Sequence, residues 1–183
     1  MIPILYPIEQ TIFMGNGLAP LYDAISCKCT EILNGSYEID LQLPANSTNL
    51  QYIKNNCSIK VKPNYSDPPQ IFRIYSIDKK YNNDVSIKAA HISYDTCGIP
   101  ILPFTAETLD AAIDNLNTNR KLLSESRFVL NSNFSADGRI EVKTPTSFRS
   151  LLGGSENSIS EIYGGEYHYD NYTINLLDRK SVV

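Results

Sequence analysis

The sequence predicts a mainly β fold with an α+β second part, in which an antiparallel, barrel-like domain is followed by a small α+β domain. Three observations support this prediction. Residues 24–43 have the pattern of two strands joined by a tight turn, and further short alternating segments follow up to about residue 94. Beyond them, helical spacing is mixed with short strands. We therefore place the domains at residues 1–96 and 97–183.

The hairpin within residues 24–43 is the strongest local signal. Apolar and polar residues alternate on both arms, and this period of two predicts one buried and one solvated face. The apolar positions are Ile25, Cys27, Cys29, Tyr37, Ile39, Leu41 and Leu43. Between the arms, Asn34-Gly35 predicts a type I′ turn, in which both central residues have positive φ. A lone hairpin is marginal in water, so this one needs more strands to pack on.

The rest of the first domain supplies those strands. Residues 2–8 look like a short strand or an extended edge, because proline is tolerated only at sheet edges. Three further strands are expected at residues 58–62, 70–77 and 85–92. The connections are a polar loop at residues 44–49, a proline-rich turn at 63–69 and a turn at 82–84. Strands of this length and spacing are typical of an antiparallel barrel or sandwich, and we expect one small closed barrel.

The second domain is expected to contain one amphipathic helix. Thr105 is its predicted N-cap, and Glu107 lies in its predicted first turn, where the helix dipole favours an acid. The apolar residues at helical spacing are Leu109, Ala112, Ile113 and Leu116. The helix is expected to end at residues 117–119.

Short strands and turns complete the second domain. Strands are expected at residues 127–134 and 139–142, joined by a turn at Asp137-Gly138. A short helix at residues 148–152 is expected to stop at Gly153-Gly154. Residues 166–170 and 172–177 predict a second hairpin that turns at Asp170-Asn171.

Composition excludes several classes of protein. Of the 183 residues, 42% are hydrophobic and 20% charged, which suits a globular protein rather than a disordered one. The net charge is -4 and there is no basic run, so strong binding to a nucleic-acid backbone is not expected. The apolar N-terminus lacks a basic region and is broken by Pro3 and Pro7, so we expect no signal peptide and no membrane segment.

The four cysteines do not predict a metal site. Cys27, Cys29, Cys57 and Cys97 form no Cys-x-x-Cys motif, and the two histidines lie far apart in the sequence. Cys27 and Cys29 share one face of a strand, which is a poor geometry for pairing with each other. We interpret the cysteines as small buried thiols made in a reducing cytoplasm.

His91, with Tyr94 and Asp95 nearby, is the most suggestive group for catalysis, because an acid beside a histidine orients proton transfer. The stronger interpretation is structural, since a single histidine at a strand end usually packs or satisfies backbone groups. Gly153-Gly154-Ser155 lacks the flanking pattern of a hydrolase turn. No catalytic residue is predicted, and we expect no enzyme activity.

Oxygen ligands for calcium are available near the second hairpin. Glu166, Asp170, Asn171 and Asp178 do not form an EF-hand loop, and carboxylates beside turns usually cap backbone groups. The 12 tyrosines could serve a carbohydrate site, yet many alternate within strands and are expected to be half-buried. We predict no metal, no cofactor and no cofactor-binding residue.

Three groups of residues along the chain form a recognisable pattern. They are Gly17-Leu18, Asp23-Ala24, Cys27, Glu31 and Leu33-Asn34-Gly35-Ser36-Tyr37-Glu38; Gln70-Ile71-Phe72-Arg73-Ile74 with Ala90-His91-Ile92-Ser93-Tyr94-Asp95; and Leu151-Leu152-Gly153-Gly154, Gly164-Gly165-Glu166 and Asp170-Asn171-Tyr172. In their order and spacing they resemble the N-terminal portion of phage minor structural proteins of the prophage tail family.

The resemblance implies a baseplate hub, tail-associated or tail-tip protein of a long-tailed phage. Such proteins form homotrimers whose barrel domains make a ring that continues the tail tube. The partners implied are the distal tail protein, tail tube or tape-measure proteins, and genomic DNA that passes through without specific binding. The implied location is the tail tip of the virion, after assembly in the bacterial host cytoplasm.

The resemblance also implies parts that these 183 residues do not contain. Family members continue with a second tube-like barrel, then often with a peptidase or receptor-binding part. We therefore expect residues 1–96 to be a tube domain and the second tube barrel to be absent. Either the sequence is a truncated gene or a fragment, or the later domains of the family are absent.

A physical mechanism follows as a hypothesis. Barrels joined side by side around a pore would present their polar faces to the lumen, and an acidic lumen would repel DNA phosphate. Glu38 and Asp40 are the candidates for such a surface, with simple solvation as the equal alternative. Two other functions stay open, namely a cell-wall-degrading tail peptidase fragment and a receptor- or carbohydrate-binding module.

Overall fold

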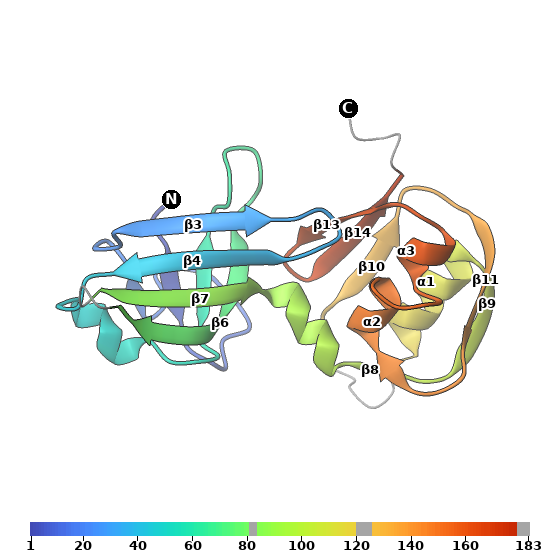
Figure 1. Ribbon diagram of the computed structural model, residues 1–183, viewed down its shortest axis with the longest axis horizontal. Coiled ribbons are helices and arrows are strands. Elements are labelled where there is room, and N and C mark those ends of the chain that lie inside the picture. The colour runs from blue at the N-terminus through green and yellow to red at the C-terminus, as the bar shows by residue number, and fades with distance from the viewer. Residues whose placement is uncertain (81–83, 120–125, 179–183) are drawn as a thin grey trace. The chain divides into compact units, whose positions relative to one another are not determined.

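The computed structural model of the protein describes residues 1–80, 84–119 and 126–178. The chain divides into two compact units, which we call unit 1, Met1–Ile92, and unit 2, Ser93–Val183 (Figure 1). Unit 1 is built on one curled antiparallel sheet, whereas unit 2 combines short helices with small sheets. The mainly β fold with an α+β second part is therefore confirmed.

Unit 1 contains a seven-stranded sheet with the strand order β2-β1-β5-β6-β7-β4-β3. Its strands are β1 (Ile4–Tyr6), β2 (Ala19–Pro20), β3 (Ser26–Glu31), β4 (Tyr37–Leu43), β5 (Ser58–Val61), β6 (Gln70–Lys79) and β7 (Val85–His91). All the neighbouring pairs are antiparallel. The sheet curls into a half-barrel, but β2 and β3 stay at its edges, so the expected closed barrel is wrong for the described strands.

The core of unit 1 lies against one face of this sheet. Cross-strand neighbours from every long strand meet there because alternate side chains point to the same face. The fully buried members of this layer are Leu5, Ile59, Phe72, Ile74, Ile87, Ala89 and Leu41. On the opposite face, the loop after β1 covers Tyr6, whose ring meets Phe13 edge-on at 5.2 Å and whose hydroxyl donates to the Gly15 carbonyl.

The β3–β4 hairpin forms as expected, but its turn does not. The Ile32 N–H donates to the Ser36 carbonyl at 2.7 Å, which leaves three residues in the loop instead of two. Asn34 has a positive φ of 52°, and Gly35 does not. The predicted type I′ turn is therefore wrong, because that turn needs exactly two loop residues that both have positive φ.

Short 3₁₀ segments and a bulge were not expected. The polar loop at 44–49 runs into η1 (Thr48–Tyr52), and η2 (Ile92–Gly98) follows β7. The register between β6 and β7 shifts between Ile74 and Ser76, which marks a β-bulge. Of the turn predicted at 82–84, residues 82 and 83 lie outside the described part of the chain.

Unit 2 has three small sheets, with strand orders β10-β14-β13, β11-β9 and β12-β8. Its strands are β8 (Pro100–Ile101), β9 (Phe104–Thr108), β10 (Val129–Ser132), β11 (Asp137–Val142), β12 (Thr146–Ser147), β13 (Glu166–Asp170) and β14 (Thr173–Leu177). Its α-helices are α1 (Leu109–Thr118), α2 (Phe148–Leu152) and α3 (Ile159–Ile162). The pairing of β10 with β14 is parallel, which the sequence did not indicate.

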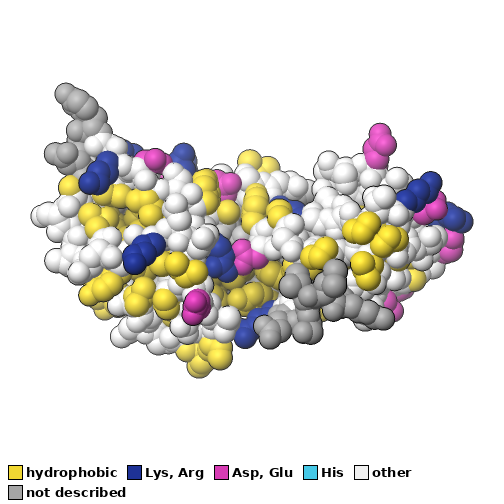
Figure 2. All heavy atoms as spheres, turned by 90° about the horizontal axis from the view of Figure 1, so that it is seen from below, with side chains coloured by type: hydrophobic (Ala, Val, Ile, Leu, Met, Phe, Trp, Pro, Cys, Tyr) yellow, Lys and Arg dark blue, Asp and Glu magenta, His cyan; other side chains and the backbone are white. Residues whose placement is uncertain are grey.

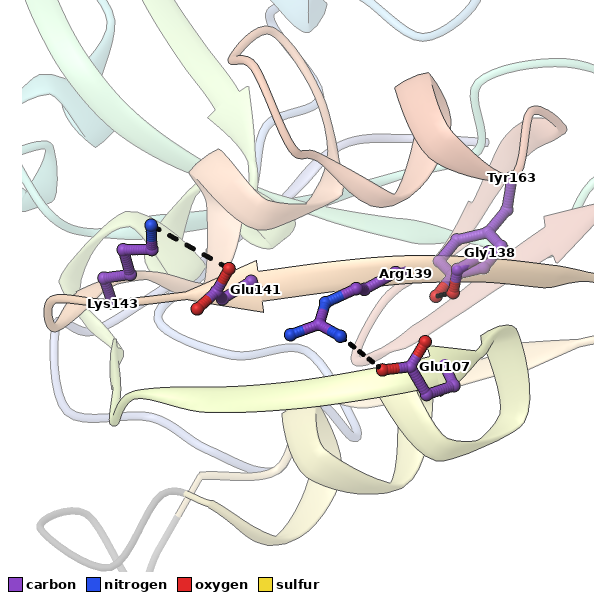
Figure 3. Close-up of polar contacts among 6 residues, drawn as sticks. All are labelled: Glu107, Gly138, Arg139, Glu141, Lys143 and Tyr163. Atoms are coloured by element: carbon purple, nitrogen blue, oxygen red, sulfur yellow. Dashed lines mark hydrogen bonds and ion pairs between the residues drawn. The ribbon is translucent and has the colours of Figure 1, made fainter.

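Helix α1 buries all four residues of its predicted apolar stripe, but it starts later than predicted. Its N-cap is Thr108, whose side-chain oxygen accepts from the Ala111 N–H at 3.3 Å. Thr105 and Glu107 instead belong to β9, which pairs with β11. In Figure 3, the Glu107 carboxylate faces Arg139 across these two strands at 3.2 Å. The strand pairing overrides the capping signal.

The remaining expectations for unit 2 have mixed outcomes. The second hairpin is confirmed, but its turn is Asn171-Tyr172 instead of Asp170-Asn171, because Asp170 still pairs with Thr173. Helix α2 ends where Gly153 was expected to stop it. The expected strand at 127–134 is shorter, and Asp137-Gly138 begins β11 instead of forming a turn. Among the described helices, none has the length and apolar character needed to span a membrane.

Candidate functional surfaces

His91 is fully buried in unit 1 as part of an aromatic cluster. Its ring stacks on Tyr37 at 4.7 Å and meets the ring of Phe72 edge-on at 5.5 Å. Its Nε2 atom lies 3.1 Å from Oε1 of Gln70, which is also buried. These contacts fit the structural interpretation of His91, because a buried imidazole held by an amide cannot reach a substrate in solvent.

Tyr94, the suggested neighbour of His91, has a different role in unit 2. The guanidinium of Arg149 lies over the Tyr94 ring at 4.5 Å and over the Tyr169 ring at 5.4 Å. It also donates a hydrogen bond to the Tyr169 hydroxyl at 3.1 Å. Arg149 is thus held between two aromatic rings, an arrangement that stabilises packing through cation–π attraction.

The four cysteines are free thiols, and three of them are at least partly buried. Burial raises the pKa of Cys27 and of Cys29 to about 11, so both are protonated at neutral pH and are poor nucleophiles. Cys57 is buried and contacts the Tyr52 carbonyl. Cys97 is exposed, so the expectation of buried thiols is wrong for this residue.

The acidic residues near the second hairpin are spread along it rather than gathered. Glu166 pairs with Leu177 at one end of the hairpin and Asp170 with Thr173 at the other, roughly 13 Å apart at the usual rise per residue. The Asn171 side chain donates to the Asp170 carboxylate. No group of three metal-ligating side chains forms among residues 1–80, 84–119 and 126–178.

Glu38 and Asp40 lie on the solvated face of β4, as the alternation predicts. Glu38 accepts a hydrogen bond from Tyr75 at 3.0 Å, and Asp40 accepts one from Ser86 at 3.1 Å. The cross-strand neighbours of Asp40 are both lysines, Lys28 on β3 and Lys88 on β7. This face therefore carries charges of both signs, and the expectation of an acidic surface is wrong for it.

An open groove of about 620 Å³ lies in unit 1 where β1 ends and β5 begins. Its apolar lining comes from two segments that are distant in the sequence. Ile8 and Leu18 lie in the loop between β1 and β2, and Tyr52 lies at the end of η1. Charged side chains at the groove include Glu9 and Lys54. The sequence did not indicate this groove, because residues 7–18 and 51–57 come together in the fold alone.

Comparison with known proteins identifies the family. Residues 7–92 match a family described as the prophage endopeptidase tail N-terminal domain. Residues 7–92 belong to the prophage tail family. The matched range lies within unit 1, and the family expected from the sequence is confirmed.

A solved structure resembles this chain over nearly its whole length. It is prophage tail protein gp18 from Listeria monocytogenes EGD-e, with a TM-score of 0.70 and 14% sequence identity. The alignment covers 99% of this chain and 52% of gp18, so this chain spans about half the length of that protein. At this identity the likeness shows a shared fold. No curated protein sequence matches the chain.

Proposed function

We propose that this chain is a structural component of a phage or prophage tail tip, as the N-terminal part of a baseplate hub or tail-associated protein. The observation that carries the proposal is the coincidence of a prophage tail N-terminal domain with the half-barrel of unit 1. The fold shared with a Listeria prophage tail protein supports it across unit 2 as well.

The proposed role is to form a ring that continues the tail tube and attaches the distal parts of the tail. A half-barrel suits this role because its sheet has two edges, β2 and β3, at which neighbouring copies of the chain would join. The proposed partners are further copies in a homotrimer, the distal tail protein, and tail tube or tape-measure proteins.

Genomic DNA would pass through such a ring without specific binding. The outward face of β3, β4 and β7 alternates in sign from Lys28 through Asp40 to Lys88, so this row offers no continuous positive track for phosphates. Because these charges largely balance, the net attraction of this row to the DNA backbone would be weak.

The proposed role needs no catalysis. In the described chain, the candidate base His91 is enclosed by Tyr37, Phe72 and Gln70, and the thiols of Cys27 and Cys29 are protonated at neutral pH. The family description includes the word endopeptidase, so we retain a cell-wall-degrading peptidase as the alternative.

Immunogold electron microscopy of induced phage particles tests the location. With an epitope tag on this protein, we expect gold at the end of the tail distal to the head. Labelling along the whole tail, or particles without label, would contradict a tail-tip role. An epitope tag on the major tail tube protein provides the control for access of the antibody.

A peptidoglycan-release assay tests the absence of catalysis. The purified chain is incubated with labelled cell walls, with and without a metal chelator, beside a known muralytic enzyme. We expect release at the level of buffer alone. Release that the chelator abolishes would favour the peptidase alternative over a purely structural component.

A further inference from the structure

The groove where β1 ends and β5 begins has polar side chains in addition to its apolar lining. Exposed apolar surface alone does not single it out, because hydrophobic side chains lie over much of the face of unit 1 shown in Figure 2. Four hydrogen-bonding side chains also line the groove, those of Glu9, Gln10, Gln51 and Lys54. Its volume of about 620 Å³ is in the range of small-molecule sites. The groove therefore combines a surface for packing with groups that fix the orientation of a ligand.

The two amides in the groove are oriented by the chain itself. Nε2 of Gln10 donates to the Ile12 carbonyl at 2.5 Å, and Nε2 of Gln51 donates to the Thr48 carbonyl at 2.9 Å. A carbonyl oxygen only accepts hydrogen bonds, so the amide nitrogen is the atom that is held in both side chains. Oε1 of each amide is thereby left as an acceptor for a ligand.

The balance of polar groups in the groove fits a neutral ligand that is rich in donors. The Glu9 carboxylate and the two amide oxygens accept hydrogen bonds, whereas the Lys54 ammonium donates them. One acidic and one basic side chain leave this lining without net charge, so it favours neither an anion such as phosphate nor a polycation. Hydroxyl and amide N–H groups are neutral donors, and a ligand that carries several of them satisfies the three acceptors.

The apolar part of the groove has an aromatic ring and two aliphatic side chains. Tyr52 is 44% exposed, while Ile8 and Leu18 remain 47% and 43% exposed. The face of a tyrosine ring suits the C–H face of a sugar ring, because both are flat and apolar with polar groups at their edges. The aliphatic side chains suit a small apolar substituent such as a methyl group. A sugar with an acetamido group carries both features.

Backbone hydrogen bonds hold both sides of the groove in place. On one side, the Gln10 N–H donates to the Pro7 carbonyl at 3.2 Å, and the Leu18 N–H donates to the carbonyl of the buried Leu5 at 2.8 Å. On the other side, the N–H of the buried Cys57 donates to the Lys54 carbonyl at 3.1 Å. The lining residues thus lie on turns that form without a ligand, which reduces the entropy lost on binding.

We propose that this groove binds an N-acetylated oligosaccharide of the kind that bacterial cell walls contain. One sugar ring packs on Tyr52, and the methyl of its acetamido group packs on Ile8 and Leu18. The hydroxyl and acetamido N–H groups donate to Glu9 and to the two amide oxygens, while Lys54 donates to a ligand oxygen. This inference goes beyond the proposed hub role and does not rest on it.

The test is an NMR titration of the purified, ¹⁵N-labelled full chain with chitotriose, a trimer of N-acetylglucosamine. We expect saturable shifts of backbone amides among residues 8–10, 18 and 51–57, and no comparable shifts in unit 2. Cellotriose is the matched control ligand, because it has a hydroxyl wherever chitotriose has an acetamido group. It should bind at least about tenfold more weakly, since it lacks the methyl and the N–H of that group. Equal binding of the two sugars, or shifts that do not saturate, would overturn the proposal.

Variants of the lining residues test the individual contacts. Tyr52→Ala should weaken chitotriose binding at least about tenfold, whereas Tyr52→Phe should keep most of it because the ring remains. Gln51→Ala removes one acceptor at an exposed position, so it should fold normally and weaken binding about threefold or more. Tyr65→Ala, at an exposed tyrosine in the loop before β6, is the control and should bind like the wild type. Unchanged binding in the Tyr52→Ala and Gln51→Ala variants, with circular dichroism showing that they are folded, would refute the site.

The outcomes separate this site from the proposed hub role. Chitotriose binding that depends on Tyr52, by a chain that gives no gold label on phage particles, supports the site and overturns the hub role. Gold at the tail tip without saturable chitotriose shifts supports the hub role and refutes the site.

Discussion

Units 1 and 2 bury apolar side chains in different ways. Unit 1 has a single sheet whose seven strands share one apolar layer, so each strand is supported by neighbours far along the chain. Unit 2 has sheets of two or three strands, and polar side chains join them to the helices. The Asn117 amide, for example, accepts from the Leu130 N–H and donates to the Leu130 carbonyl.

The comparison shows two routes from a sequence to a fold. In unit 1 the period of two along each strand already specifies which face is buried, and the sheet follows from it. In unit 2 the elements other than α1 are short, so specific hydrogen bonds to buried groups help to select the arrangement. Four experiments separate these two modes of stabilisation.

The largest effect is expected from truncating the central aromatic of unit 1. Phe72 is fully buried against Tyr37 and His91, so Phe72→Ala should cost about 3–5 kcal/mol of folding free energy. Hydrogen exchange should show lost protection in all the strands of unit 1 and retained protection in unit 2. Phe148→Ala, at a fully buried position in α2, should give the reverse pattern. Equal loss in both units after either change would mean that they unfold together.

A smaller effect is expected from the amide that joins α1 to β10. Asn117→Ala leaves the N–H and carbonyl of the buried Leu130 without this partner, which should cost about 1–3 kcal/mol. The matched control is Asn115→Ala on the same helix, because that amide donates to the Ala111 carbonyl within α1. Urea denaturation measures the free energy of unfolding of both variants. If the two variants lose the same stability, polar joining of α1 to β10 is not what holds unit 2.

Tyr167 predicts an alkaline limit for unit 2. Burial, followed by the nearby Tyr169, raises the pKa of Tyr167, and its hydroxyl donates to the Leu152 carbonyl at 2.7 Å. A raised folded-state pKa means that stability is complete below about pH 10, and is lost as the pH rises above that value while the unfolded phenol ionises.

Tyr167→Phe should therefore cost about 1 kcal/mol at pH 7 and reduce the fall in stability above about pH 10. Thermal unfolding monitored from pH 7 to pH 11 measures this change. Tyr65→Phe is the control, because Tyr65 is fully exposed. An unchanged alkaline slope in Tyr167→Phe would assign the limit to another group.

The smallest effect is expected at the surface of the β9–β11 pair. The ion pair between Arg139 and Glu107 is exposed on both sides, so Glu107→Gln should change stability by less than about 0.5 kcal/mol. Urea denaturation of the variant and the wild type at low and high salt measures this change in stability. A loss above about 1 kcal/mol would show that this pair, and not the Tyr163 hydrogen bond to Gly138 beside it in Figure 3, holds β11 in place.

The elements that could be predicted from the sequence are those with a regular spacing of apolar residues. Five of the seven strands of unit 1, the stripe of α1 and the β13–β14 hairpin follow from alternation or helical spacing, whereas β1 was expected from its prolines. Of the seven, β2 is too short for any period. The start of α1 was misplaced because Thr105 and Thr108 are both good caps, and only the pairing of β9 with β11 decides between them.

The candidate surfaces were harder to predict for a physical reason. The sequence favoured a structural His91, but the contacts of this residue with Gln70 and Tyr37 depend on the sheet register and could not be predicted. The mixed charge around Asp40 has the same cause, since Lys28 and Lys88 are adjacent only across strands. The groove joins residues some 40 positions apart, and no local pattern marks it.

The protonated thiols on β3 bear on chemical durability. With a pKa of about 11, Cys27 and Cys29 are thiolates in roughly one molecule in ten thousand at pH 7. Oxidants and disulfides react mainly with thiolates, so both residues resist modification when surroundings change from reducing to oxidising. In a particle that carries this strand out of a cell, oxidation of these two thiols would therefore be slow.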